Sequence, residues 1–186
     1  MSASSKQDSL CEPLIKAVPN LRAFAISLCG DVDRADDLVQ ETLVKAWNNL
    51  ASFQEGTNLK AWLFTILRNT YFSECRKLRR EVKDPDGELA AKLSVHPEQH
   101  GHMDFVDFNT ALAKLSDDQR EALILVGAEG FSYEEVAAIS GCAVGTVKSR
   151  VNRARVRLAE LLRVHGAGDF GPEGGTEAAL ASTAAR

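Results

Sequence analysis

The apolar residues of this chain recur at three- and four-residue intervals over two long stretches, and this spacing restricts what it can fold into. The first stretch covers residues 12–81 and the second covers residues 105–164. One face of a helix repeats at these intervals, so each stretch predicts amphipathic helices around a shared core. Nowhere do valine and isoleucine alternate with polar residues between hairpin turns, as half-buried strands would require. We therefore predict an all-α fold of two small helical domains.

A polar segment over residues 82–104 separates the two stretches. It opens with the turn sequence Asp84-Pro85-Asp86-Gly87, which is typical of loops. We expect a flexible linker here, with room for a short helix at Glu88–Leu93. Residues 165–186 are rich in glycine, alanine and threonine, which predicts a disordered tail. Residues 1–11 are polar, and we expect them to be frayed.

The charges of the chain are distributed unevenly. The 22 basic and 26 acidic residues give a formal net charge of −4, which by itself argues against a nucleic-acid partner. Residues 68–83, however, contain six basic and two acidic residues, and residues 148–163 contain six basic residues and one acidic residue. Because local charge decides whether a surface attracts phosphates, we expect two basic helices on an acidic scaffold.

Other classes of protein are disfavoured by what the sequence lacks. The four cysteines have no zinc-knuckle or redox-pair spacing, and the cluster of His96, His100 and His102 has no cysteine or acidic ligands at a recognisable spacing. We expect no metal and no other cofactor. Without a phosphate loop or an acid–base set, the chain is predicted not to be an enzyme. Without a signal peptide or an apolar run of roughly 20 residues, it is expected in the cytoplasm with no membrane contact.

The first stretch contains an amphipathic helix around residues 36–47. Its apolar residues are Ala35, Leu38, Val39, Leu43, Ala46, Trp47 and Leu50. Asp37, Gln40 and Glu41 lie on the other side. A solvated face is the plainer interpretation, but a Gln-Glu pair on an acidic face could equally dock a partner helix.

A second helix is predicted over residues 59–80. Its buried stripe consists of Leu59, Trp62, Leu63, Ile66, Leu67 and Thr70, and its exposed side carries Lys60, Arg68, Asn69, Arg76, Lys77, Arg79 and Arg80. Such a basic stripe suits phosphate contacts, although cations also favour the C-terminal end of any helix. Asn69 has the donor and acceptor needed to read a base edge.

The second stretch predicts a helix-turn-helix. Ser116 with Gln119, and Ser132 with Glu135, match the capping box that begins a helix. Gly141 supplies the turn after the short helix that Ser132 begins, and a longer helix follows from about residue 144. An ordinary helical hairpin would have the same spacing. The residues on the exposed face of the last helix must therefore distinguish it from a DNA-binding helix-turn-helix.

That last helix has the chemistry of a DNA recognition helix. Its apolar stripe consists of Val144, Val147, Val151, Ala154, Leu158 and Leu161. Thr146, Ser149, Asn152 and Arg153 lie opposite the stripe, and Lys148, Arg150, Arg155 and Arg157 flank them. Short polar groups with a central arginine suit base edges, and outer cations suit phosphates. We expect the N-terminal half of this helix to enter the major groove.

Several segments resemble extracytoplasmic-function sigma factors, promoter-specificity subunits of bacterial RNA polymerase. Residues 36–47, Asp-Asp-Leu-Val-Gln-Glu-Thr-Leu-Val-Lys-Ala-Trp, resemble the core of sigma region 2, and residues 59–70 resemble its part that reads the −10 element. Residues 131–137 and 144–150 resemble region 4, which reads the −35 element. The two matches occur in the family's order, with a short linker between them.

The resemblance implies roles for individual residues. Asp37, Gln40 and Glu41 would dock on the clamp of the polymerase β′ subunit. Asn69, with the loop at residues 54–58, would hold a flipped −10 base, and the cations of the same helix would hold the strand: Lys60, Arg68, Arg76, Arg79 and Arg80. The −35 duplex would be bound by Thr146, Lys148, Ser149, Arg150, Asn152, Arg153, Arg155 and Arg157. The apolar surface of region 4 would bind the β flap.

Residues 141–155 further resemble the alphaproteobacterial general-stress-response subgroup. Members of this subgroup are held by a small anti-sigma factor, which a regulator with a sigma-like decoy domain captures. The resemblance thus implies a stress-response sigma factor under anti-sigma control. One alternative is a decoy that binds an anti-sigma factor without reading DNA, but a decoy would lose cations such as Lys148 and Arg153. A helix-turn-helix repressor is the other alternative, and it would leave Gln40 and Glu41 unexplained.

Overall fold

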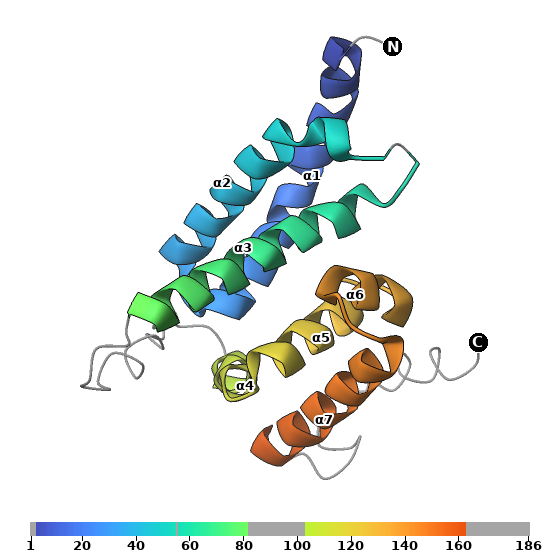
Figure 1. The fold of residues 1–186 in the computed structure, drawn as a ribbon. Coiled ribbons are helices and arrows are strands. Elements are labelled where there is room, and N and C mark those ends of the chain that lie inside the picture. The colour runs from blue at the N-terminus through green and yellow to red at the C-terminus, as the bar shows by residue number, and fades with distance from the viewer. Residues whose placement is uncertain (1–2, 55, 82–102, 163–186) are drawn as a thin grey trace.

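A computed structural model describes residues 3–54, 56–81 and 103–162, and these residues form an all-α fold. The elements are α1 (Ala3–Cys29), α2 (Val32–Asn48), the 3-10 turn η1 (Leu50–Ser52), α3 (Leu59–Glu81), α4 (Met103–Ala113), α5 (Asp117–Gly127), α6 (Tyr133–Ser140) and α7 (Val144–Leu162). Helices α1–α3 form a first bundle and α4–α7 a second (Figure 1). The described residues contain no strand, and the predicted fold class is confirmed.

The first bundle is held together by the apolar stripes of its three helices. Phe24 of α1 and Phe64 of α3 stack with their ring centroids 5.0 Å apart, and both side chains are fully buried. Helix α2 begins at a cap, where the Asp31 side chain accepts a hydrogen bond of 2.8 Å from the backbone nitrogen of Arg34. Leu38 and Leu63 complete the centre of this core.

The second bundle contains the predicted helix-turn-helix. The Ser132 hydroxyl accepts from the backbone nitrogen of Glu135, whose carboxylate accepts in return from the Ser132 nitrogen, so the predicted capping box is present. Gly141 ends α6 at φ +63°, a conformation that favours glycine. Ser116 does precede α5, but its side chain makes no capping bond. The capping box predicted there is wrong.

The two bundles share one hydrophobic core. Phe64 of the first bundle and Phe131 of the second meet edge to face, with ring centroids 5.2 Å apart. Leu125 and Val136 belong to the same buried cluster as Leu67. Helix α3 lies alongside α5 and α6 in Figure 1, and it contacts α6. Helix α3 is therefore covered on two sides, by α1 and α2 and by the second bundle.

The predicted elements need three corrections, two at the ends of helices and one in the burial of a side chain. Residues 3–11 are helical rather than frayed, because α1 begins at Ala3 and Leu10 packs against the core. Helix α4 begins at Met103, two residues before the predicted second stretch. Trp47 is 44% exposed, because it lies one residue, about 100° around the helix, beyond the buried Ala46.

Some predictions concern residues outside those that the structure describes. They are the linker up to residue 102 with its histidines and its short helix, and the C-terminal tail. Among the described helices, none combines the length and the apolar character that crossing a bilayer requires.

Candidate nucleic-acid and polymerase interfaces

The C-terminal half of α3 presents part of the predicted basic stripe to solvent. Asn69, Arg76 and Arg80 are exposed. Arg76 folds back on its own helix and donates to the Phe72 carbonyl at 3.2 Å and to the Ser73 hydroxyl at 3.2 Å. The side chain of Arg79 lies outside the described set. This end of α3 therefore offers cations and an amide to a ligand.

Two other residues of the predicted stripe face the second bundle instead. Arg68 Nε lies 2.5 Å from the Glu121 carboxylate, and the Arg68 side chain is only 17% exposed. Lys60 Nζ lies 2.9 Å from the Glu129 carboxylate and 5.0 Å from the centre of the Phe131 ring. The prediction that both project into solvent is wrong for this arrangement, because α3 has a second buried side.

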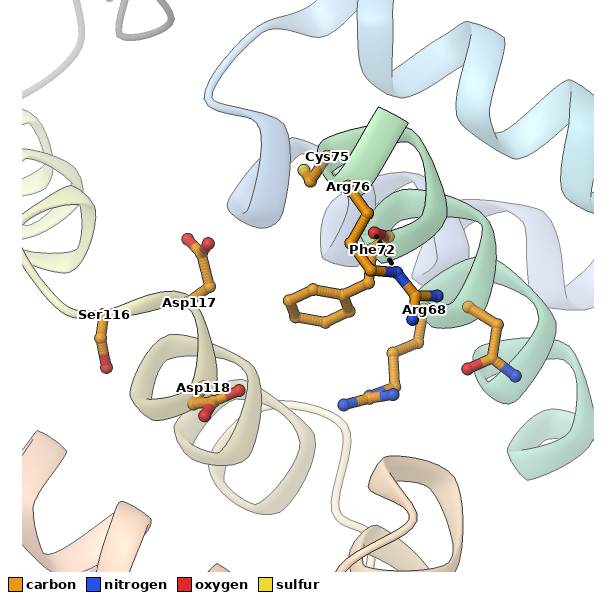
Figure 2. Close-up of a pocket in the computed structure, with 8 residues that line it drawn as sticks. Arg68, Phe72, Cys75, Arg76, Ser116, Asp117 and Asp118 are labelled. Carbon is orange, nitrogen blue, oxygen red and sulfur yellow. Dashed lines mark hydrogen bonds between the residues drawn. The ribbon is translucent and has the colours of Figure 1, made fainter. Parts of the chain in front are cut away.

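A cavity of about 460 Å³ lies between α3 and the first turn of α5. Figure 2 shows Arg68 and Phe72 extending from α3 toward the α5 turn that carries Asp117 and Asp118. The remaining lining residues are Asn69, Cys75, Arg76 and Ser116. The cavity thus has a cationic wall on α3 and an anionic wall on α5, and Asn69 is one of the residues that line it.

The loop before α3 is held by the second bundle. Asn58 accepts from the backbone nitrogen of Ala61 at 3.1 Å and so caps α3. Its amide nitrogen donates to the Glu135 carboxylate at 2.8 Å. Hydrogen bonds from the Ser132 backbone and from Asn58 lower the pKa of Glu135. The sequence offers no signal for this contact, since the two residues are 77 positions apart.

The predicted polymerase-binding residues lie together on the exposed face of α2. Asp37, Gln40 and Glu41 are all exposed. Lys45 lies 2.6 Å from Glu41 and lowers the pKa of that carboxyl. Val44, 59% exposed, and Trp47 follow Gln40 by four and seven residues and share its face. The sequence analysis did not identify Val44 and Trp47 as surface residues. Their spacing of four and seven residues from Gln40 places them on the same face of the helix and would have indicated their exposure.

The predicted recognition face of α7 is largely open to solvent. Val147, Val151 and Ala154 are buried against the bundle. On the other side the exposed residues are Thr146, Lys148, Asn152, Arg153, Arg155 and Arg157, and Ser149 is half-buried. Arg150 is the exception, because its guanidinium pairs with Asp118 of α5 at 2.7 Å. Arg157 pairs with Glu160 at 3.0 Å on the surface.

Among the residues of the second bundle whose burial is described, Glu121 is the charged residue buried most deeply, and it was not predicted to matter. It is 1% exposed, and its Oε1 accepts from Arg68 and, at 2.9 Å, from the Ser140 hydroxyl. Its Oε2 has no hydrogen-bond partner among the described residues. Burial raises the pKa of Glu121, and the nearby Arg68 opposes that shift.

Two family models match the chain. Sigma-70 region 2 matches residues 14–81, which end with α3, and Sigma-70 region 4 matches residues 105–158, which include the helix-turn-helix. The matched regions therefore correspond to the first bundle and the second bundle.

No group of three or more potential metal ligands occurs among the described residues.

Curated proteins resemble the chain over most of its length. The ECF RNA polymerase sigma factor EcfG of Rhodopseudomonas palustris (strain TIE-1) is 64% identical over 166 residues, which cover 89% of this chain and 92% of the relative. The ECF RNA polymerase sigma factor SigC of Mycobacterium tuberculosis (strain CDC 1551 / Oshkosh) is 35% identical, with 85% and 86% covered.

Solved structures resemble it as well. The sigma factor RpoE in complex with the anti-sigma factor NepR, from Bartonella quintana, matches with a TM-score of 0.76 and 57% identity, covering 85% of this chain and 99% of that one. The PhyRSL–NepR complex from Sphingomonas sp. Fr1 matches with a TM-score of 0.64 at 19% identity, covering 89% and 94%. The second likeness concerns the fold alone.

Proposed function

The chain belongs to the extracytoplasmic-function RNA polymerase sigma factors, and on this premise we propose how its two bundles divide the work of promoter-specific initiation. The second bundle binds the −35 duplex through α7. The observation that carries this assignment is the exposed polar and basic face of α7, opposite the buried Val147 and Val151. Asn152 and Arg153 read base edges, while Lys148 and Arg155 hold phosphates.

The first bundle binds the −10 element through α3 and the loop before it. Asn69 contacts an unstacked base, and Arg76 and Arg80 hold the strand. The support for these roles is their exposure on one end of the helix beside a cavity of mixed charge. Taking a base out of the stack requires a few kcal/mol, so a shaped site with polar groups is needed to offset that loss.

The exposed face of α2 binds the core polymerase. Asp37, Gln40 and Glu41 contact the clamp of the β′ subunit, and the exposed Val44 and Trp47 supply the apolar area that a stable contact needs. Aromatic residues at the centre of an interface carry a large share of the binding energy. The β flap is contacted by the apolar surface of the second bundle, on which Val156 is 54% exposed.

The chain acts in the cytoplasm under the control of a small anti-sigma factor, in the general stress response. The support is its likeness, at 57% identity, to a sigma factor crystallised with the anti-sigma factor NepR. A decoy that captures an anti-sigma factor without reading DNA is the second candidate. The exposed Lys148 and Arg153 favour the sigma factor, since a decoy has no use for a cationic recognition face.

Transcription in vitro with purified core polymerase on a genomic promoter library tests the assignment. The wild type is compared with the double variant Gln40→Ala/Glu41→Ala and with Glu12→Ala, an exposed acidic residue of α1 that serves as the control. Wild type and control should initiate, and the double variant should fail to bind core polymerase. If the wild type neither binds core nor initiates, the decoy function replaces this one.

A further inference from the structure

Lys45 of α2 joins two helices of the first bundle. Its Nζ pairs with the Glu41 carboxylate, one turn earlier on the same helix, at 2.6 Å, and donates a hydrogen bond of 3.0 Å to the Thr70 hydroxyl of α3. Thr70 is only 3% exposed, and it lies 25 positions from Lys45 in the sequence. The ammonium group is therefore held between the exposed face of α2 and a buried side chain of α3.

The bond to Thr70 distinguishes Lys45 from an ordinary surface lysine. A glutamate and a lysine four residues apart on a helix commonly pair, but such a pair contributes little, because both side chains must give up rotamer freedom to form it. A second acceptor on a neighbouring helix restricts the rotamers of the lysine. The position of the Glu41 carboxylate is then fixed by that of Lys45.

The other nearby carboxylate, that of Glu74 on α3, has a cation of its own. Glu74 lies close to both Glu41 and Lys45, and its burial together with the charge of Glu41 raises the pKa of Glu74. Arg34 Nη2 of α2 lies 3.8 Å from the Glu74 carboxylate, and the Arg34 guanidinium lies 5.9 Å from the centre of the Tyr71 ring. Since Arg34 balances Glu74, Lys45 remains the cation of Glu41.

The Glu41 carboxylate is still available to a partner protein. Lys45 pairs with its Oε1, yet the Glu41 side chain is 46% exposed, and a carboxylate accepts several hydrogen bonds at once. Asp37 and Gln40 lie on the same exposed face of α2. Association immobilises interface side chains and so reduces affinity. A carboxylate that is held in place before binding therefore loses less freedom and binds more tightly.

We propose that Thr70 and Lys45 are positioning residues for the binding of core polymerase. Thr70 fixes the ammonium group of Lys45, and Lys45 fixes the Glu41 carboxylate in the orientation that meets the β′ clamp. This inference rests on the proposed function, which places Glu41 in that contact. It extends the polymerase-binding machinery from the surface of α2 to a buried hydroxyl on α3.

Fluorescence anisotropy of the full-length chain, labelled at its N-terminus and titrated with purified core polymerase, gives the affinity. Thr70→Val keeps the size of the side chain but removes the hydrogen-bond acceptor, and it should weaken core binding by about fivefold. Thr70→Ser retains the hydroxyl and should bind as the wild type does. Lys45→Met, which removes the ammonium group, should cause at least the loss seen for Thr70→Val.

Thr42→Val is the matched control. Thr42 is also buried, but its hydroxyl donates to the Leu38 carbonyl of its own helix at 2.8 Å. This variant should keep wild-type affinity for core polymerase, and thermal unfolding shows that each variant is folded. Wild-type affinity of Thr70→Val or of Lys45→Met would overturn the inference.

The double variant Glu41→Ala/Thr70→Val distinguishes positioning from a general structural effect. If Thr70 acts through Glu41, Thr70→Val should cause no further loss of affinity once Glu41 has been replaced. An equal loss with and without Glu41 would show that Thr70 does not position this carboxylate, and would overturn the inference.

Glu41→Ala alone separates this inference from the proposed function. If Glu41→Ala weakens core binding and Thr70→Val does not, the positioning role is wrong and the docking of α2 on the polymerase stands. If Glu41→Ala binds core polymerase as tightly as the wild type, the proposed contact itself fails, and the positioning role fails with it.

Discussion

Arg120 of α5 donates a hydrogen bond from Nη1 to the carbonyl oxygen of Leu28, at 3.2 Å. Leu28 lies in the last turn of α1, where helix carbonyls lack partners within the helix. The hydroxyl of Tyr71 donates to the same oxygen at 3.0 Å. A cation from the second bundle thus caps a helix of the first, at the end where the helix dipole favours positive charge.

We expect Arg120→Ala to lower the free energy of unfolding by about 2 kcal/mol, because it removes charged hydrogen bonds to half-buried carbonyls. Urea unfolding followed by circular dichroism measures the change. Arg157→Ala is the control, since its pair with Glu160 is exposed on the surface and such pairs contribute at most about 1 kcal/mol. Equal losses in the two variants would show that the Arg120 cap is unimportant.

The buried Glu121 should make stability depend on pH. Burial raises the pKa of this carboxyl in the folded protein above its ordinary value of 4.5, so the folded state binds the proton more tightly than the unfolded state. The contribution of Glu121 is therefore greatest below that ordinary value and declines as the pH rises through the raised pKa.

The measurement is the free energy of unfolding of the wild type minus that of Glu121→Gln, across a pH series. Other carboxylates titrate in both proteins and cancel in this difference. We expect the difference to fall as the pH increases above 4.5. A difference that stays constant, or that rises with pH, would contradict the raised pKa.

Cys29 should be the slowest cysteine to react in the folded protein. Burial raises the pKa of its thiol to about 11, and the residue is only 7% exposed. Because the thiolate is the reactive form, iodoacetamide at neutral pH should modify the half-buried Cys11 first. Mass spectrometry of peptides follows each site, and in urea the two rates should converge. Rapid labelling of Cys29 before unfolding would refute the prediction.

Two glycines, Gly141 and Gly145, lie at or near the turn of the helix-turn-helix. Only Gly141 should be required as glycine. Gly141→Ala places a side chain at φ +63° and should destabilise the protein by about 1–2 kcal/mol. Gly145→Ala is the matched control: it lies within α7 with open space around it, and alanine should stabilise the helix by roughly 0.5–1 kcal/mol. Thermal unfolding of both variants gives the two signs, and a shared sign would contradict the turn geometry.

Arg153 on the exposed face of α7 should contribute to binding of duplex promoter DNA. Arg153→Ala should weaken binding, and if the residue also neutralises a phosphate, the slope of log affinity against log salt should decrease by about 0.9. Lys16→Ala, an exposed cation on α1, should leave both quantities unchanged. Titrations at several salt concentrations give the slopes, and identical behaviour of the two variants would remove Arg153 from the interface.

Local sequence patterns were enough to predict α2, α3, α5, α6 and α7, the turn and the family. The capping box at Ser132 and Glu135 and the glycine at position 141 involve neighbours within four residues, so they can be read directly from the chain. The stripe of Val147, Val151 and Ala154 likewise predicted which face of α7 is buried. These features depend on contacts within a single helix or turn.

The pairing between the bundles was decided only by the tertiary structure. Periodicity identifies one apolar stripe per helix, but α3 is covered on two sides, so Lys60 and Arg68, predicted to be exposed, face Glu129 and Glu121. The partners lie 69 and 53 positions apart. A charged residue looks the same in the sequence whether its counter-ion is a phosphate or a distant carboxylate. Packing between the two bundles, such as that of Phe64 against Phe131, brings these charges together.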